Sequence, residues 1–220
     1  MKKCINGSIM TLITNQQQYS ISSHDFIWSQ LQGTPFPSSP RFDLVLAYVS
    51  ITLEHQHAII NLVGLKLVGS AFALLRPQVE TAFRGLWVNL IATDEQVTAI
   101  AKDGKEPFPK FRDMASELDT RYGLDGWCSS IAAQWGALNG FTHSGLEQLG
   151  HRFRDDGNIF PTYPDEMIAS LLQLSATISI GLLPAIYRNM GLQDKASALE
   201  QWLDDYVKPK PDVVPTPALS

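Results

Sequence analysis

Residues 167–187 form an unbroken stretch without a single charged side chain. A helix needs roughly 20 residues to cross a bilayer, so a stretch of this length has to be buried, either in a membrane or in the core of the protein. Polar and helix-weakening residues are spread along it, namely Ser170, Gln173, Ser175, Thr177, Ser179, Gly181 and Pro184. Because these residues lower its hydropathy, we interpret the stretch as a buried core helix, with a transmembrane helix as the alternative.

The composition predicts one folded domain in a reducing compartment. Of the 220 residues, 45% are hydrophobic and 18% are charged, which is enough apolar material for a core. The two cysteines, Cys4 and Cys128, are too few for a disulfide framework or a zinc knuckle. The basic start, residues 1–7, lacks the apolar run of a signal peptide. We therefore expect a cytoplasmic protein without membrane association and without a cofactor.

Charge and short motifs exclude several common functions. The formal net charge is -5, which argues against a nucleic-acid binder that works through a broad basic surface. The sequence contains no GxGxxG, GxxxxGK[ST], HExxH or GxSxG motif. An enzyme whose site is assembled from distant helices is not excluded, so the sequence leaves open whether the protein is an enzyme.

The spacing of apolar residues predicts an all-α protein. They recur near the helical period over residues 40–64, and no strand pattern alternates with helices. Ser39 precedes a proline as an N-cap would, and Thr93 with Gln96 resembles a capping box. Further helices are expected at 71–92, 94–103, 110–122, 125–143, 164–190 and 195–207. We expect a single helical bundle of about six or seven helices.

Three regions follow from this pattern. Residues 1–20 are polar and are interpreted as a flexible N-terminal arm, with a short strand possible at Ser8–Ile13. Residues 21–207 form the all-α domain. Residues 208–220 contain four prolines and are expected to be a disordered, extended tail.

Three charged residues lie on an otherwise apolar helix. Arg76, Glu80 and Arg84 follow one another at i, i+4 and i+8, so Glu80 can pair with either arginine. A charge buried there must be paired or must face a polar cleft. The cluster is therefore either a structural ion-pair network that fixes the helix register or the centre of a binding site. Trp87 follows one turn later and belongs to the candidate site, although it can equally be a core aromatic.

A second polar row lies on the helix predicted at 125–143. Trp135, Asn139 and His143 repeat at i, i+4, and His143 is near the expected C-terminus, where the helix dipole favours imidazolium. Small residues in this stretch allow a ligand or another helix to approach the backbone. The alternative is that His143 is a satisfied buried histidine and Trp135 a core aromatic.

Glu54 and His57 form an E-x-x-H pair, the spacing found in carboxylate-bridged di-metal bundles. Such a site needs a second copy of the pair, and the sequence has none. We interpret the two residues as part of a solvated helix face and predict no metal site, with a site formed by Glu54, His57 and His143 as the alternative.

The two polar rows occur within longer motifs, RPxxExxxRGxW at residues 76–87 and WxxLNxxTHSG at residues 135–145. Together they resemble an uncharacterised family of bacterial all-helical proteins, a domain of unknown function, over roughly residues 40–190. This resemblance implies the fold and a shared polar site, and no activity. A more distant likeness is to the HEPN superfamily, which includes ribonuclease toxins and phage-defence proteins. Their signature, an arginine followed four to six residues later by a histidine, is absent here.

Two functions are compatible with these residues. The first is a binding or interaction module for a small anion or a partner protein, with Arg76, Glu80, Arg84, Trp87 and Trp135 in the site. Homodimerisation through an apolar helix face is also possible.

The alternative function is a hydrolase acting on RNA or a nucleotide, in a toxin or phage-defence context. His143 would be its general acid and base, and Asn139 would orient the imidazole. This alternative requires His143 within a few Å of Arg76 and Arg84.

Overall fold

The computed structural model describes residues 3–104, 107–123, 126–154 and 156–207. Within these ranges the protein is all-helical, as expected, but the number of helices is ten instead of six or seven. They are α1 (Lys3–Leu31), α2 (Pro40–Gly64), α3 (Val68–Leu90), α4 (Asp94–Asp103), α5 (Phe111–Tyr122), α6 (Trp127–Ala133), α7 (Trp135–Thr142), α8 (Leu146–Gly150), α9 (Asp165–Asn189) and α10 (Gln193–Val207).

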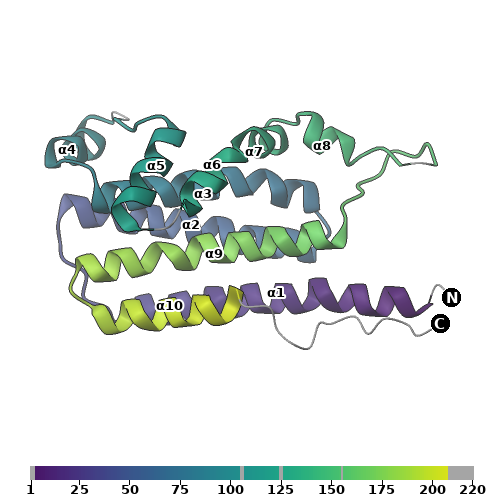
Figure 1. Ribbon diagram of the computed structural model, residues 1–220, viewed down its shortest axis with the longest axis horizontal. Coiled ribbons are helices and arrows are strands. Elements are labelled where there is room, and N and C mark those ends of the chain that lie inside the picture. The colour runs from purple at the N-terminus through teal and green to yellow at the C-terminus, as the bar shows by residue number, and fades with distance from the viewer. Residues whose placement is uncertain (1–2, 105–106, 124–125, 155, 208–220) are drawn as a thin grey trace.

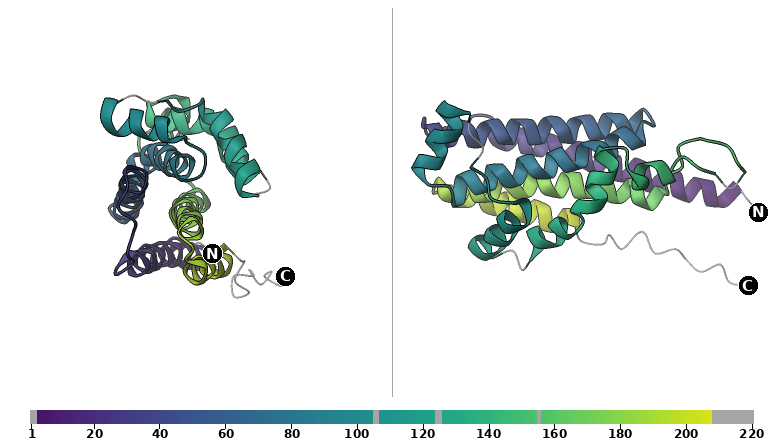
Figure 2. Two further views of the ribbon diagram at one scale, coloured as in Figure 1. Left: turned by 90° about the vertical axis from the view of Figure 1, so that its left-hand side faces the viewer. Right: turned by 90° about the horizontal axis from the view of Figure 1, so that it is seen from above.

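Four long helices, α1, α2, α3 and α9, form a bundle, and α10 packs beside α9 (Figure 1). The short helices α4 to α8 lie together on the side of the bundle that α3 occupies, as the end-on view in Figure 2 shows. Of these, α5 and α7 contact α3 directly. The polar row predicted on α3 is therefore flanked by a layer of short helices.

The uncharged stretch lies in α9, which is long and apolar enough to cross a membrane by length and composition alone. In the structure 61% of its most apolar window is buried inside the fold, against α1, α2, α3 and α10. Its polar side chains are used within the bundle. Gln78 of α3 donates from Nε2 to the Ser175 carbonyl and to Ser179 Oγ, both at 3.0 Å. These bonds use both N–H groups of the buried Gln78 amide and link α3 to α9.

The N-terminal region differs from the prediction. Residues 3–20 are neither a loose arm nor a strand, because α1 runs without interruption to Leu31. Ser20 and Ser23 are buried, and Gln56 of α2 donates to Ser23 Oγ at 2.9 Å. The glutamines at 16–18 are polar, which suggested a loose arm, but glutamine has a good helix propensity. Gln17 donates to the Ile60 carbonyl at 3.2 Å, so a contact distant in sequence anchors this part of α1.

Local signals mark the starts of α2 and α4 correctly. Ser39 accepts from the backbone N–H of Phe42, and Thr93 and Gln96 form the capping box. The helix predicted at 125–143 is wrong as a single element, since the chain turns at Gln134 between α6 and α7. The N-terminus of α6 is capped from a distance by Asp119, whose two oxygens accept from the N–H groups of Cys128 and Ser129 at 2.8 Å. The expected tail, 208–220, lies outside the described residues.

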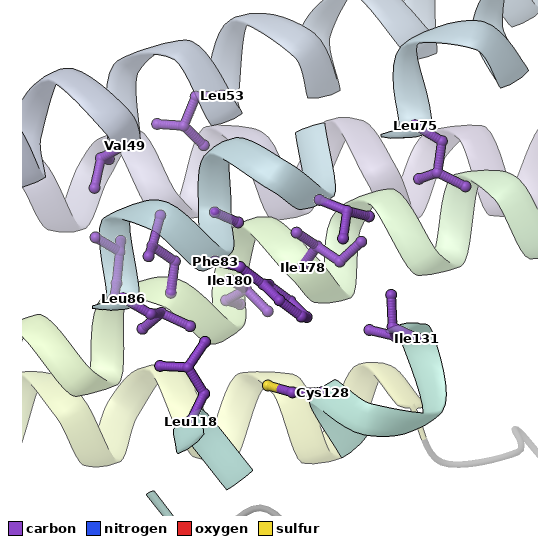
Figure 3. Packing of buried hydrophobic residues seen from close by; sticks show 14 of the residues in the cluster. Val49, Leu53, Leu75, Phe83, Leu86, Leu118, Cys128, Ile131, Ile178 and Ile180 are labelled. Carbon is purple, nitrogen blue, oxygen red and sulfur yellow. The ribbon is translucent and has the colours of Figure 1, made fainter. Parts of the chain in front are cut away.

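The core reaches from the bundle into the short helices. Cys128 and Ile131 of α6 and Leu118 of α5 lie against Phe83 of α3 (Figure 3). This packing holds α5 and α6 on the surface of α3. The position of the short helices, and with it the geometry of the polar row, therefore depends on the core.

Candidate functional site

Arg76, Glu80 and Arg84 form a continuous row of charge along α3. The Arg84 Nη2 lies 2.8 Å from Glu80 Oε1, and the Arg76 Nη2 lies 3.6 Å from Glu80 Oε2. The three side chains are 24%, 27% and 25% exposed, in chain order. One carboxylate thus lies between two guanidinium groups and contacts both. Solvent reaches the row without hydrating it fully.

Three rings line this row, and we call Phe108, Phe111 and Trp135 the aromatic wall. The Arg76 guanidinium lies over the Trp135 ring, 4.8 Å from its centroid, and the Arg84 guanidinium lies over Phe108 at 4.6 Å. Trp135 and Phe111 stack with centroids 3.7 Å apart. Cation–π contacts of this kind hold both guanidiniums in fixed planes. The arginines are consequently positioned for hydrogen bonding and are not mobile surface side chains.

Trp87 supports the wall from the inside. It is only 2% exposed, its ring meets Phe108 edge-to-face at 5.4 Å, and its Nε1 donates to Glu117 Oε2 at 3.2 Å. The predicted placement of Trp87 close to the charged row is therefore found, but its ring lies behind Phe108. A ligand at the row would touch Phe108 before it touched Trp87.

A hydrogen bond joins the second motif to α3, one turn before the proline of the first motif. Pro77 has no N–H and cannot satisfy the carbonyl of Ala73, four residues earlier in α3. Thr142 of α7 donates from Oγ1 to this Ala73 carbonyl at 3.1 Å, and also lies 3.0 Å from the carbonyl of Leu138. The proline thus creates an acceptor on α3, and the threonine of the second motif fills it. This contact sets Trp135, two turns earlier in α7, beside Arg76.

Among the described residues no hydrogen bond, ion pair or ring contact is recorded between His143 and Arg76 or Arg84. His143 follows Thr142 as the C-cap of α7 and is exposed. Thr142, the residue before His143, lies beside Ala73 of α3. The backbone of Arg84 is eleven residues further along α3 than that of Ala73, which corresponds to about 16 Å of helix rise. Asn139 is half-buried on α7. The hydrolase with His143 as its acid and base, which requires both arginines within a few Å of the imidazole, stays a prediction.

Two buried polar atoms near this interface lack a hydrogen-bond partner in the described part of the chain. They are the Nε of Arg76 and the Oδ1 of Asn139. Buried donors and acceptors are satisfied in most structures. Both atoms are shielded from solvent in this structure.

Glu54 and His57 lie elsewhere, in an open groove between α1 and α2 that also contains His24 and Trp28. The His24 and His57 rings are 5.1 Å apart, and Trp28 Nε1 lies 3.2 Å from His24 Nε2. Among the described residues no three His, Cys, Asp or Glu side chains gather in a way that could hold a metal ion. Glu54, His57 and His143 thus do not form the metal site considered as an alternative.

Sequence reasoning missed three residues that shape the site, Phe108, Phe111 and Thr142. Phe108 lies between prolines 107 and 109, and Phe111 is the first residue of the polar helix α5, so nothing in the local pattern links either ring to α3. The role of Thr142 could have been predicted from Pro77. A proline inside an apolar helix leaves a carbonyl that needs a donor from another element, and a hydroxyl in a small-residue helix is a suitable one.

Comparison with known proteins gives one match. The model of a family described as a family of unknown function, DUF6988, matches residues 49–208. The matched region contains the charged row, the aromatic wall and α7. Searches of curated proteins and of solved structures find no match.

Proposed function

The chain belongs to DUF6988, a family of unknown function, and we propose from the geometry of its charged row that it is a binding module for a small anionic group, a carboxylate or a phosphate. The observation that carries the proposal is the sharing of Glu80 by Arg76 and Arg84. Two fixed guanidiniums on an aromatic wall already hold one carboxylate. An anion of similar size and charge can compete for the same donors.

Three features support this function. Arginine offers several N–H donors in a planar fork, which suits carboxylate and phosphate oxygens. The row is about one-quarter exposed, so an anion from solvent can reach it while its charges remain partly desolvated. Arg76 Nε is a buried donor without a partner in the described residues.

Within this proposal Glu80 acts as an internal competitor. With Glu80 bound to both arginines, the empty site is satisfied electrostatically and the protein is stable. When an external anion binds, Glu80 must move away or share its donors. Affinity for the anion is therefore lower than two free arginines would give.

The decisive experiment replaces Glu80 by glutamine. Glu80→Gln keeps the shape of the side chain but removes its charge, so both guanidiniums gain donors for an external anion. We expect phosphate or succinate, titrated at constant ionic strength, to raise the melting temperature saturably in the wild type. In Glu80→Gln the affinity should rise about tenfold, equivalent to about 1.4 kcal/mol.

The matched control is Asp94→Asn. Asp94 pairs with Arg41 at 2.7 Å, and its loss removes the same charge from a site without an aromatic wall. This variant should show the wild-type response to phosphate and succinate. If neither anion stabilises the wild type or Glu80→Gln, or if Asp94→Asn gains as much affinity as Glu80→Gln, the row is a structural ion-pair network and the proposed function is wrong.

A further inference from the structure

A second potential site lies on another side of the molecule. A cavity of about 360 Å³ opens between α9, α10 and the short helices α5 and α6, with Leu86 of α3 at its base. Its lining is mainly apolar and consists of Leu86, Tyr122, Trp127, Thr177, Gly181, Pro184, Glu200, Leu203 and Asp204. No residue of the charged row or of the aromatic wall belongs to it. Its volume falls in the range of sites for small organic molecules.

Gly181 gives independent evidence that this space is open. A Cβ atom placed on Gly181 would meet no atom within 4 Å. Glycine in the middle of a helix costs stability relative to alanine. A glycine inside a helix is often explained by a neighbour that packs closely against it. Gly181 has no such neighbour, so the missing side chain leaves open space beside α9. Pro184, one turn later, also lines the cavity and keeps the wall of α9 free of backbone donors there.

The polar groups of the cavity select the charge of a ligand. The Tyr122 hydroxyl is buried beside the guanidinium group of Arg188. Burial raises the pKa of Tyr122 to about 12, more than the nearby positive charge of Arg188 lowers it, so the hydroxyl is neutral at pH 7. Glu200 is paired with Arg188, Nη2 to Oε2 at 2.6 Å. Asp204 is exposed, and no ion pair joins it to another described residue.

Aromatic rings and carboxylates together are typical of sites for organic cations. Trp127 and Tyr122 line the cavity and aromatic rings attract positive charge, while the exposed Asp204 adds a negative charge to the lining. The positive charge of Arg188 is paired with Glu200, so it does not cancel the negative charge that Asp204 contributes to the cavity. We propose that this cavity binds a small apolar amine in its protonated form, with the hydrocarbon part inside and the ammonium group towards Asp204.

The test uses three probes of the same size and different charge, 3-phenylpropylamine, 3-phenylpropanol and 3-phenylpropionate. Each is titrated into the full chain while the indole N–H signal of Trp127 is followed by NMR. We expect saturable shifts with the amine binding most tightly, the alcohol less tightly and the carboxylate least. Binding of the carboxylate as tightly as the amine, or the absence of any saturable shift, would overturn the proposal.

Two pairs of variants locate the binding. Gly181→Leu fills the cavity and should abolish amine binding, whereas Gly181→Ala leaves most of the volume and should still bind. Asp204→Asn should lower the preference for the amine over the alcohol about two- to fivefold, as expected for an exposed charge. Asp205→Asn removes the same charge from the neighbouring position and should leave the preference unchanged.

An unchanged affinity in Gly181→Leu would place the probe elsewhere and refute the site. If Gly181→Leu fails to fold, the Asp204 and Asp205 variants decide alone, since both positions are exposed. Glu80→Gln should bind the amine as the wild type does, so the outcome here is separate from that of the anion site.

Discussion

The hydrogen bond between Thr142 and the Ala73 carbonyl should be energetically coupled to Pro77. Thr142→Val removes the hydroxyl but keeps the branched shape of the side chain. In the wild type this leaves the Ala73 carbonyl without a donor, because Pro77 cannot supply one. In a Pro77→Ala background the restored N–H of residue 77 can satisfy the same carbonyl, and the loss of the hydroxyl matters less.

The structure gives the size of the effect. Thr142 Oγ1 lies 3.1 Å from the Ala73 carbonyl oxygen, a normal distance for a neutral hydrogen bond, and the residue is half-buried. Leaving such an acceptor unsatisfied costs about 1–2 kcal/mol. The second contact of the hydroxyl, to the Leu138 carbonyl, is lost in both backgrounds and cancels. We therefore expect a coupling energy of about 1 kcal/mol between Thr142→Val and Pro77→Ala.

The assay is a double-mutant cycle measured by urea unfolding. Thr52→Val provides the control, because the Thr52 hydroxyl also donates to a carbonyl four residues earlier, that of Tyr48 at 2.8 Å, but has no relation to Pro77. The Thr52 cycle should be additive within about 0.5 kcal/mol. Equal costs of Thr142→Val in both backgrounds would refute the idea that the proline creates the acceptor that joins α3 to α7.

Three further predictions follow from buried groups. Gln78→Ala should lower the free energy of unfolding by about 2–4 kcal/mol in urea titrations, because it leaves a cavity and unpairs Ser179 Oγ; a loss below 0.5 kcal/mol would contradict this. His24 has a pKa below 6.5, first because it is partly buried and then because His57 is near. The unfolded state therefore binds more protons, and stability should fall as the pH drops through about 6.5. NMR titration should show a His24 midpoint below that of a model histidine, and His57→Gln should raise it. The Cys128 thiol has a pKa raised by burial, then by Asp119, so it should react with a thiol reagent at pH 8 only at the rate of unfolding; fast labelling of the folded protein would contradict its position in the core.

The sequence predicts those parts of the fold that depend on neighbouring residues. The starts of α2 and α4 follow from Ser39 and Thr93, whose side chains cap the helix that they precede. The row on α3 follows from i, i+4 spacing. The arrangement of Arg76 and Arg84 around Glu80 needed no information from the rest of the chain.

Contacts distant in sequence explain what could not be predicted. The start of α6 depends on Asp119, which belongs to α5, so the residues next to Trp127 carry no capping signal of their own. The N-terminal part of α1 is ordered by bonds such as that from Gln17 to the Ile60 carbonyl. Phe108 reaches Arg84 only because the core holds α5 against α3. A polar run or an isolated aromatic residue does not reveal such partners in the sequence.

The most direct test of the anion site is to follow the arginines themselves. Phosphate is titrated into the wild type at fixed ionic strength, and the Nε–H signals of Arg76, Arg84 and Arg41 are recorded by NMR. We predict that Arg76 and Arg84 shift saturably with one common dissociation constant, while Arg41 does not respond. Equal, non-saturating shifts of all three arginines would mean that phosphate only screens charge, and would contradict a binding site on α3.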